Sequence, residues 1–483
     1  MNPCQTQTHH HPGRRRIGSL LTLAAAMALA GCASLQPEAA LAPVQEAARK
    51  HLGASVQPSH SEEDLRAVAE RLGELLAAPL SADAAVQIAL LNNRGLQASL
   101  AELGMVEAER VQASRLPNPG FSLGRMRRGD EREIERGASF DLGHLIGLPW
   151  ARELENRRLT ARQQQLTLEL LNLAADTRRA YLLAVAAQQS AAYAREVQAA
   201  AEAGAELGRR MAQAGNWNAL QQAREHGFYA EAALQTARTE AAGLATRERL
   251  IRLLGLWGAQ TARLTLPARL PELPAAALEQ PEIEQAGLAS RLDVQAARIQ
   301  VEASARSLGL SRVRGFIKVL ELGAQRNSSK EAPVQTGYDI RFELPLFDWG
   351  DARVAKAEAV YMQSVHRAAQ TAIAARSELR EAYLGYRSAY DIARHHRDEL
   401  LPAAKRISEQ NLLRYNGMFI SVFELLADTR AQIGVVRASI DALRDFWLAQ
   451  AELEMARLGK PALDSAAAVS SGTAPTGAAA AAH

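Results

Sequence analysis

The stretch Arg414–Gly459 reads RYNGMFISVFELLADTRAQIGVVRASIDALRDFWLAQAELEMARLG. It opens with a short break at Asn416–Gly417. Beyond this break it contains no proline and only one internal glycine, Gly434, so the pattern continues as a long helix. Gly417 is expected to supply the permissive backbone that a tight turn between helices needs. The stretch therefore predicts a turn followed by the second arm of a helical hairpin.

The residues before this turn, Asp351–Tyr415, are expected to form the first arm. They contain one proline, Pro402, and one glycine, Gly385. At 1.5 Å per residue, an arm of about 60 residues is roughly 90 Å long. Because ordinary globular helices are much shorter, the hairpin is expected to belong to a coiled coil or a helical tube.

The composition of the 483-residue chain agrees with long, closely packed helices. Hydrophobic residues make up 48% of it, but aromatic residues only 5%. The formal net charge of +3 comes entirely from Arg14, Arg15 and Arg16. Because the rest of the chain is neutral, we expect no nucleic-acid partner.

Residues 1–31 are organised as a lipoprotein signal peptide. The three arginines precede the apolar run Ile17–Ala30, and the segment ends in Leu29-Ala30-Gly31-Cys32. Leu-Ala-Gly-Cys resembles the bacterial lipobox, whose cysteine becomes the lipidated first residue of the mature protein. We therefore predict a lipid anchor, palmitate included, on Cys32; a plain signal peptide beside an incidental cysteine is the alternative. Ala33 follows Cys32 at the place where lipoproteins retained in the inner membrane usually carry aspartate, so the outer membrane is favoured.

The segment after the leader is predicted to be a connection rather than a domain. Residues 32–80 contain four prolines and are expected to form a lipidated tether and collar. The only other cysteine, Cys4, lies in the leader, so one mature chain cannot form an internal disulfide. A first long helix is expected from Ser81, a good N-cap, to Leu116, where Pro117 ends it.

The periodicity of the sequence pattern then changes twice along the chain. Gly120–Leu148 is glycine-rich, with two strand-like pieces around a Gly129-Asp130 turn. From Ala151 to about Ala214 the pattern is helical again, Gly215–Asn218 interrupts it, and a second arm ends at Leu254. Apolar residues at heptad-like spacings predict the packed seams of the two arms. These residues are Leu159, Leu166, Leu170, Leu173 and Ala180 in the first arm, and Leu234, Ala237, Ala241, Leu244 and Ile251 in the second.

The same order of elements then occurs again. Helix Ala289–Arg314 echoes the helix after Ser81, about 198 residues earlier. Strand-like Phe316–Leu322 and Gly337–Phe347 and the long hairpin follow it. We therefore predict a mainly α fold with a β part, built from two tandem repeats of helix, strand pair and long hairpin. The repeats cover residues 81–280 and 281–460, and a low-complexity tail covers 461–483.

The strand-like pieces are amphipathic. In Gly337–Phe347, GYDIRFELPLF, apolar and charged residues alternate between the two faces. This pattern suits a barrel wall with lipid outside and water inside, or an amphipathic surface hairpin. Four strands cannot close a membrane barrel, and lipid-exposed edges are excluded. Either the strands lie outside the membrane, or several chains share one barrel.

Three segments carry a resemblance to the TolC-like outer-membrane factors of tripartite efflux systems, over roughly residues 81–460. They are PLFDWG (345–350), RYNGMFISVFELLADTR (414–430) and ALRDFWLAQAELEMARLG (442–459). They look like the family's strand-to-helix junction, periplasmic tip and closing helix. The resemblance implies a homotrimer whose twelve strands form an outer-membrane β-barrel on a long periplasmic α-helical barrel.

The resemblance also implies the function and the partners. The chain would be a lipid-anchored channel of the cell outer membrane with a large periplasmic portion. It would passively conduct small molecules or metal ions that a periplasmic adaptor and an inner-membrane pump of the RND type deliver. The cargo stays open, because drug and heavy-metal systems both fit.

The resemblance places contacts with the adaptor at the two hairpin tips. These residues are Gly215, Asn216, Trp217 and Asn218 at one tip, and Asn416, Gly417, Met418, Phe419, Ile420 and Ser421 at the other. Glu424, with Asp428 nearby, falls where family members carry an acidic residue at the narrow tunnel end. Three copies would form a gating ring; a solvated helix charge is the alternative. Arg414 and Arg430 are expected mainly to form surface ion pairs, with contacts to the adaptor or to each other's helices as alternatives.

An enzyme is not expected. The sequence contains no G-x-S-x-G, P-loop, H-E-x-x-H or cysteine cluster, so we predict no catalytic residue, cofactor or metal site. The competing hypothesis is a lipid-anchored periplasmic coiled-coil scaffold or adaptor without a pore. It explains the hairpins and Cys32, but not the strand pair that follows the first helix of each repeat.

Overall fold

The computed structural model describes residues 37–59, 61–279, 283–313, 320–329, 333–342 and 350–459. The leader with Cys32, the tail 461–483 and residues 345–349 of the predicted strand-to-helix junction lie outside the described residues. Strand-like Phe316–Leu322 and Gly337–Phe347 lie partly outside them.

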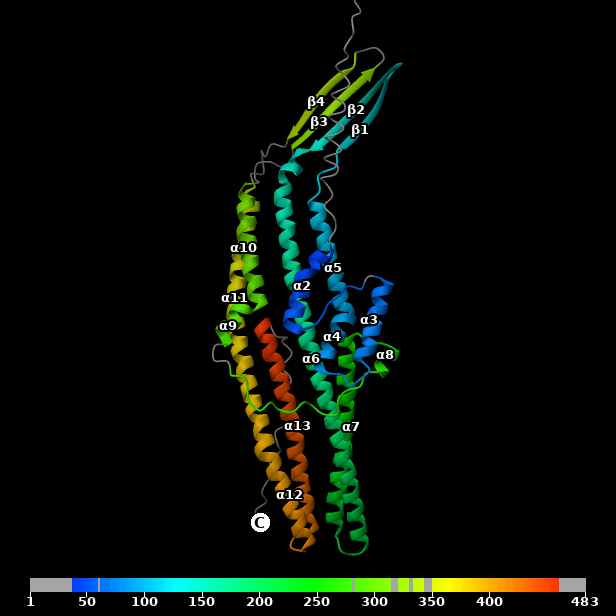
Figure 1. Cartoon of the computed structure of the whole chain (residues 1–483), viewed down its shortest axis with the longest axis vertical. Helices are drawn as coiled ribbons and strands as arrows, with labels where there is room; N and C mark the ends of the chain where they lie inside the picture. Colours follow the sequence, from blue (N-terminus) through cyan, green and yellow to red (C-terminus); the bar gives the residue numbers. More distant parts are fainter. Residues whose placement is uncertain are drawn as a thin grey trace, which may run out of the picture. The chain divides into compact units, whose positions relative to one another are not determined.

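The order of elements follows the predicted duplication (Figure 1). The N-terminal region and first repeat contain α2 (Pro37–Leu52), α3 (Glu62–Leu75), α4 (Ala82–Asn92), α5 (Arg94–Ala113), β1 (Gly120–Arg128), β2 (Glu131–Asp141), α6 (Leu142–Gln213), α7 (Ala219–Leu254) and α8 (Ala259–Ala262). The second repeat contains α9 (Ile283–Ser290), α10 (Leu292–Val313), β3 (Leu320–Ser329), β4 (Gln335–Phe342), α11 (Asp351–His395), the π-helical turn η2 (His396–Leu400), α12 (Leu401–Asn416) and α13 (Val422–Leu458).

The chain forms two compact units. One unit holds the four strands, with adjoining parts of α5, α6, α10 and α11. The other holds the two helical hairpins, α6–α7 and α12–α13, together with α3, α4, α8 and α9. The element order confirms the predicted pattern of helix, strand pair and hairpin in both repeats.

The four strands form one antiparallel sheet in the order β1-β2-β3-β4. The strand pairs of the two repeats are joined where β2 pairs with β3, and Gly129 turns β1 into β2 with a φ of 62°. Among the described residues, β1 and β4 each pair on one side only, so both edges of the sheet are open.

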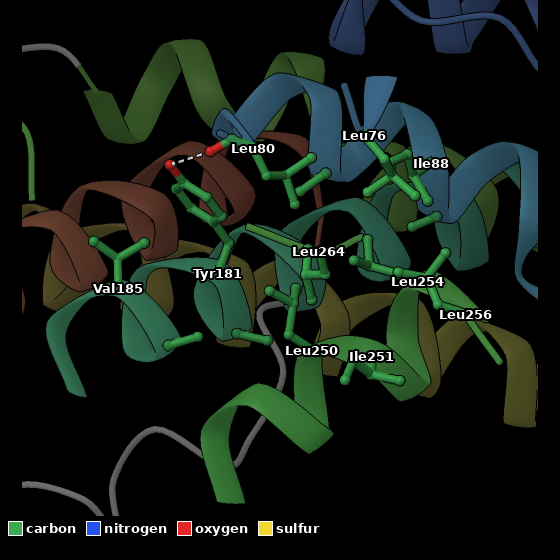
Figure 2. Packing of buried hydrophobic residues seen from close by; sticks show 14 of the residues in the cluster. Leu76, Leu80, Ile88, Tyr181, Val185, Leu250, Ile251, Leu254, Leu256 and Leu264 are labelled. Atoms are coloured by element: carbon green, nitrogen blue, oxygen red, sulfur yellow. Dashed lines mark hydrogen bonds between the residues drawn. The ribbon is translucent and has the colours of Figure 1, made fainter. Parts of the chain in front are cut away.

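The core of the hairpin unit gathers leucines from segments far apart in the sequence. Leu80, Leu250 and Leu254 are almost completely buried, and the Tyr181 hydroxyl donates a hydrogen bond of 2.9 Å to the Leu80 carbonyl (Figure 2). Leu72 of α3 also lies in this core. Part of the segment predicted to be a tether is therefore a packed helix.

The first predicted helix is interrupted. Ser81 caps it as expected, its side chain accepting from the Ala84 amide at 3.1 Å, but the helix breaks at Asn93. The amide side chains of Asn92 and Asn93 donate to the carbonyls of Leu253, Leu254 and Gly255 at the end of α7. They satisfy carbonyls that a helix end leaves unpaired. The prediction of one continuous helix to Leu116 was wrong because this capping contact is tertiary.

The packed seam was predicted largely correctly for α6, where Leu159 and Leu173 are half-buried, and incorrectly for α7. Leu166, Leu170 and Ala180 are buried. On α7, however, Ala232 and Thr236 face the neighbouring helix, and the Thr236 hydroxyl donates to the Ala194 carbonyl at 3.1 Å. The predicted residues Leu234, Ala237, Ala241 and Leu244 are exposed, and only Ile251 is buried. An apolar stripe on α7 therefore has no partner within the described part of the chain.

Candidate functional site

The tip of the first hairpin is a helix C-cap followed directly by a helix N-cap. The Asn216 amide donates to Met211 O at 2.9 Å and the Gly215 amide to Ala212 O at 3.0 Å, which is the Schellman pattern. Gly215 takes the left-handed conformation that this pattern requires, with a φ of 78°. Asn218 then caps α7.

The tip of the second hairpin has the same hydrogen bonds. The Phe419 amide donates to Arg414 O at 2.8 Å and the Met418 amide to Tyr415 O at 2.9 Å. Met418, with a φ of 61°, therefore occupies the place of Gly215. It is the only described non-glycine residue with a positive φ.

The expected role of Gly417 needs correction. Its φ is −83°, so it does not supply the left-handed turn. A Cβ at Gly417 would lie 2.8 Å from the Phe419 ring. The glycine is needed because the aromatic ring approaches the backbone closely.

Both tips start their second helix with a capping box. At the first tip, the Gln221 amide donates to the Asn218 side chain at 2.9 Å, and the Asn218 amide donates back to Gln221 Oε1 at 2.9 Å. At the second tip, the Glu424 amide donates to Ser421 Oγ at 3.3 Å, and the Ser421 amide donates to Glu424 Oε2 at 3.2 Å.

The predicted gate residue Glu424 therefore also holds the start of α13 in place. Its side chain is exposed. This role was not predicted from the sequence, although Ser421-Val422-Phe423-Glu424 has the S-x-x-E spacing of a capping box. Gln221 in the corresponding place shows that the cap itself requires no charge.

The predicted contact residues differ in exposure. Gly215, Asn216, Asn218, Asn416, Gly417 and Ser421 are exposed, and Ile420 is half-buried. Met418 and Phe419 are 92% and 79% exposed. Trp217 is instead only 7% exposed, with its ring centroid 4.6 Å from that of Phe423. The indole packs between the hairpins and is not displayed at the tip, contrary to expectation.

Gly208 makes room for this indole. A Cβ at Gly208 would lie 2.8 Å from the Cζ3 atom of Trp217. Since Gly208 is on α6, Trp217 in the turn before α7, and Phe423 on α13, the contact joins the first hairpin to the second. The two tips are therefore packed against each other through side chains.

An ion pair with a buried carboxylate also joins the hairpins. Arg430 on α13 places Nη2 2.7 Å from Oε1 of Glu225 on α7, and Glu225 is 4% exposed. The N–H bonds of Nη2 are not directed at a described acceptor, so the contact is ionic. The guanidinium carbon also lies 4.5 Å from the Phe228 ring centroid, within the range of a cation–π contact.

The other charged residues predicted near the tips lie differently. Asp428 is half-buried, and its Oδ2 atom is sheltered from solvent without a hydrogen-bond partner among the described residues. Arg414 is exposed and makes no ion pair with a described residue. Surface pairing was expected for Arg430, but its partner is a buried carboxylate on the other hairpin. No local sequence signal identifies Glu225 as that partner.

The sheet presents two different faces. Alternation along the paired strands places apolar side chains on one face, and many of them are strongly exposed. On this face, Phe121 is 81%, Leu123 78%, Tyr338 80% and Ile340 56% exposed. The other face is polar. It carries Ser122, Glu135, Ser139, Glu321, Gln325, Asn327, Asp339 and Arg341, which line a hollow of about 240 Å³.

Glycines gather on the polar face. Each strand contributes one glycine to two neighbouring rows: Gly120, Gly137, Gly323 and Gly337. A Cβ at Gly120 would lie 2.7 Å from Ser139 Oγ, and one at Gly323 would meet the Asp339 carboxylate. Glycine in a strand marks a bend or a close approach. On the polar face, the glycines thus leave the space that the Ser139 and Asp339 side chains occupy.

The described residues hold no group of three histidine, cysteine or acidic side chains placed to bind a metal ion. In the same part of the chain, no helix combines the length and the apolar character needed to cross a membrane.

Comparison with known proteins relates this fold to solved membrane proteins. The CmeC outer membrane channel of Campylobacter jejuni has a TM-score of 0.66 and 16% identity, over 83% of this chain and 89% of CmeC. The open-state MtrE outer membrane channel of Neisseria gonorrhoeae has a TM-score of 0.65 and 18% identity, over 78% of this chain and 88% of MtrE. CusC, whose folding and transmembrane channel formation are accompanied by conformational changes, has a TM-score of 0.62 and 19% identity, over 78% of this chain and 92% of CusC.

Sequence comparison finds no such relationship. No family model matches the chain, and no curated protein matches it significantly. The relationship is one of structure, and it extends over nearly the full length of the solved channels. The chain therefore has the TolC-like fold of these outer-membrane channels, as the three sequence segments had led us to expect.

Proposed function

We propose that this chain is the outer-membrane channel of a tripartite efflux system. It would passively conduct small molecules or metal ions that a periplasmic adaptor and an inner-membrane pump, of the RND type, deliver. The observation that carries this proposal is the four-stranded sheet, with an exposed apolar face, a polar glycine-lined face and two open edges. In lipid such edges must be paired, and four strands are too few for a barrel.

A homotrimer solves the edge problem, because three chains supply twelve strands. The apolar face would then contact outer-membrane lipid and the polar face the water-filled interior. The glycines support this orientation, since they suit the concave side. A lipid anchor on Cys32 would add a second attachment to the same membrane, with the helical hairpins in the periplasm.

The hairpins also offer the surfaces that a ring requires. The exposed stripe on α7 includes Leu234, 51% exposed, and Leu244, 67% exposed. A different exposed stripe lies on α11, with Ile373 at 73% and Leu384 at 59%. Two different patches on one chain suit a head-to-tail contact, and such contacts form a ring where the rotation between copies closes. We propose that α7 of one copy packs on α11 of the next.

We place the gate and the adaptor contact at the hairpin tips. Exposed Met418 and Phe419 would meet the adaptor. Three copies of Glu424 would form an acidic ring that attracts cations and repels itself as the gate narrows. The Trp217–Phe423 contact and the Glu225–Arg430 pair hold the two hairpins of each chain together. Opening would require their separation.

Conductance of the purified mature protein in a planar bilayer tests this function. A conducting trimer is expected, and Glu424→Gln should raise its conductance and lower its preference for cations. This substitution removes the charge but keeps the cap, because Gln221 already fills the same place at the first tip. The matched control is Ser421→Ala, which removes the cap oxygen and keeps the charge.

The outcomes separate the competing hypotheses. A conducting trimer that ignores Glu424→Gln would retain the channel and exclude the acidic ring. A monomer or dimer without conductance would exclude the channel. It would support the alternative, a lipid-anchored periplasmic coiled-coil scaffold or adaptor without a pore.

A further inference from the structure

The sheet places its described carboxylates on one face and most of its described arginines on the other. The apolar face carries five arginines, and none of the described side chains on it is acidic: Arg125, Arg127, Arg132, Arg136 and Arg326. The polar face carries the carboxylates: Glu133, Glu135, Asp141, Glu321 and Asp339. A water-filled interior accounts for the carboxylates, but it does not account for arginines on the opposite face.

The arginines occupy one end of the apolar face. Rows of paired residues follow each other about 6.8 Å apart along the strands. Nearest the helices are Phe140–Leu322–Ile340 and Phe121–Ala138–Ala324–Tyr338. The next row is Leu123–Arg136–Arg326–Thr336, then Arg125–Ile134–Ser328, and last Arg127–Arg132 beside the Gly129 turn. The arginines thus begin where the apolar rows end.

Four of these arginines have no counter-charge within the part of the chain that the structure describes. Arg125, Arg132, Arg136 and Arg326, here named the arginine patch, are exposed, and none forms an ion pair with a carboxylate among the described residues. Arg127 is excluded from the patch because it donates to the Gly129 carbonyl at 2.8 Å and lies 3.7 Å from Asp130.

The register of the sheet places arginines directly opposite each other, which is unfavourable in an isolated chain. Arg136 and Arg326 are direct partners across β2 and β3, and Arg127 and Arg132 are direct partners across β1 and β2. Like charges placed directly opposite each other destabilise a sheet. An anion bound between the guanidinium groups would remove this repulsion.

We propose that the arginine patch binds the phosphorylated headgroups of membrane lipids, while the neighbouring apolar rows lie against their acyl chains. Guanidinium groups match phosphate oxygens in bidentate geometry. The continuity of the patch with the apolar rows selects a lipid over a soluble anion. This inference rests on the proposed function, which places the apolar face in lipid and the helical hairpins in the periplasm; the Gly129 end, away from the helices, would then lie at the outer surface of the membrane.

Native mass spectrometry of the full-length mature protein tests the inference. The probes are lipid A, whose glucosamine headgroup carries two phosphates, and its phosphate-free counterpart. The test variant changes all four residues of the arginine patch to glutamine. Arg326→Gln alone has a matched control in Arg341→Gln, which removes an arginine of the same sheet from the opposite face.

The wild type should bind lipid A at least about tenfold more tightly than the phosphate-free lipid. The fourfold variant should lose about this factor for lipid A, and Arg326→Gln should lose part of it. Arg341→Gln should bind as the wild type does. If the fourfold variant does not assemble, the comparison of Arg326→Gln with Arg341→Gln decides the result.

Three results would overturn the inference: equal binding of the two lipids by the wild type, unchanged lipid A binding in the variants, or an equal loss in Arg341→Gln. Conductance is recorded on the same samples. If the wild type and the variants conduct and bind lipid A equally, the lipid site is excluded and the channel remains. If the wild type forms no conducting oligomer, the proposed function itself fails.

Discussion

Breaking the Glu225–Arg430 pair should loosen the connection between the two hairpins. Glu225 is 4% exposed, and Arg430 supplies the positive charge 2.7 Å from it. Arg430→Ala leaves the buried carboxylate without its counter-charge and removes the contact with Phe228. Because the pair joins α7 to α13, its loss should favour separation of the hairpins over unfolding of either one.

The free-energy cost of Arg430→Ala follows from the burial of the two side chains. Removing one partner of a fully buried pair costs about 3–5 kcal/mol. The side chain of Arg430 is 34% exposed, so water can partly replace it, and we expect about 2 kcal/mol. A bias of this size changes the ratio of separated to closed hairpins about thirtyfold. In a double-mutant cycle with Glu225→Ala, the coupling energy should be about 1–2 kcal/mol.

Two measurements report on the separation of the two hairpins. Single-channel recording gives the fraction of time that the pore is open, and hydrogen exchange at the hairpin tips gives the local stability. The control is the exposed pair Arg195–Glu240, 2.8 Å apart, which links α6 to α7 within the first hairpin. Arg195→Ala should change the open fraction little, because the pair that it breaks does not connect the two hairpins.

A coupling energy below about 0.3 kcal/mol, as expected for independent sites, would refute a role of this pair in holding the hairpins together. It would also be refuted if Arg195→Ala and Arg430→Ala changed the open fraction equally. Either outcome would mean that the ion pair does not resist separation of the hairpins.

Three further predictions concern single contacts. Met418→Gly should stabilise the second tip by about 0.5–1 kcal/mol and slow hydrogen exchange there, because glycine adopts the left-handed conformation without strain; faster exchange would contradict this. Gly208→Ala should destabilise the first tip by about 1–3 kcal/mol, because its Cβ overlaps Trp217; unchanged exchange at that tip would refute the packing argument. Glu284 on α9 accepts hydrogen bonds from Arg380 and Arg376 on α11, and these lower its pKa from 4.5 to about 2. The stabilisation that they give to the packing of α9 on α11 is fully present above pH 4.5 and is lost as the pH falls toward 2. Thermal melting between pH 5 and 2 should show this loss, and Glu284→Gln should flatten it.

Local chemistry made much of the fold predictable. Pro117 and Gly255 end helices, Ser81 starts one, and Gly129 turns a hairpin, because each acts through its own backbone or its nearest amides. The duplication was also visible, since both copies repeat the same order of periodicities. These features gave the two repeats, the two hairpins and the strand pairs without any tertiary contact.

The second tip shows where local reasoning stops. Gly417 was the natural choice for the left-handed residue, yet Met418 adopts that conformation. The Schellman hydrogen bonds fix the position of the turn relative to the last helical residues. The Phe419 ring then occupies the space beside Gly417. The hydrogen-bond pattern therefore decided the conformation over intrinsic preference.

The sequence by itself determined the order of the long helices, the strand pairs and the two hairpin turns, because those signals lie within one turn of the chain. It did not fix every boundary, since α6 begins at Leu142 and not at the predicted Ala151. Only the tertiary structure decided which side of α7 is buried, why the first helix breaks at Asn93, and that Arg430 meets Glu225. These outcomes depend on contacts between residues far apart in sequence. A periodic pattern specifies that a helix has an apolar face, but it does not specify what covers that face.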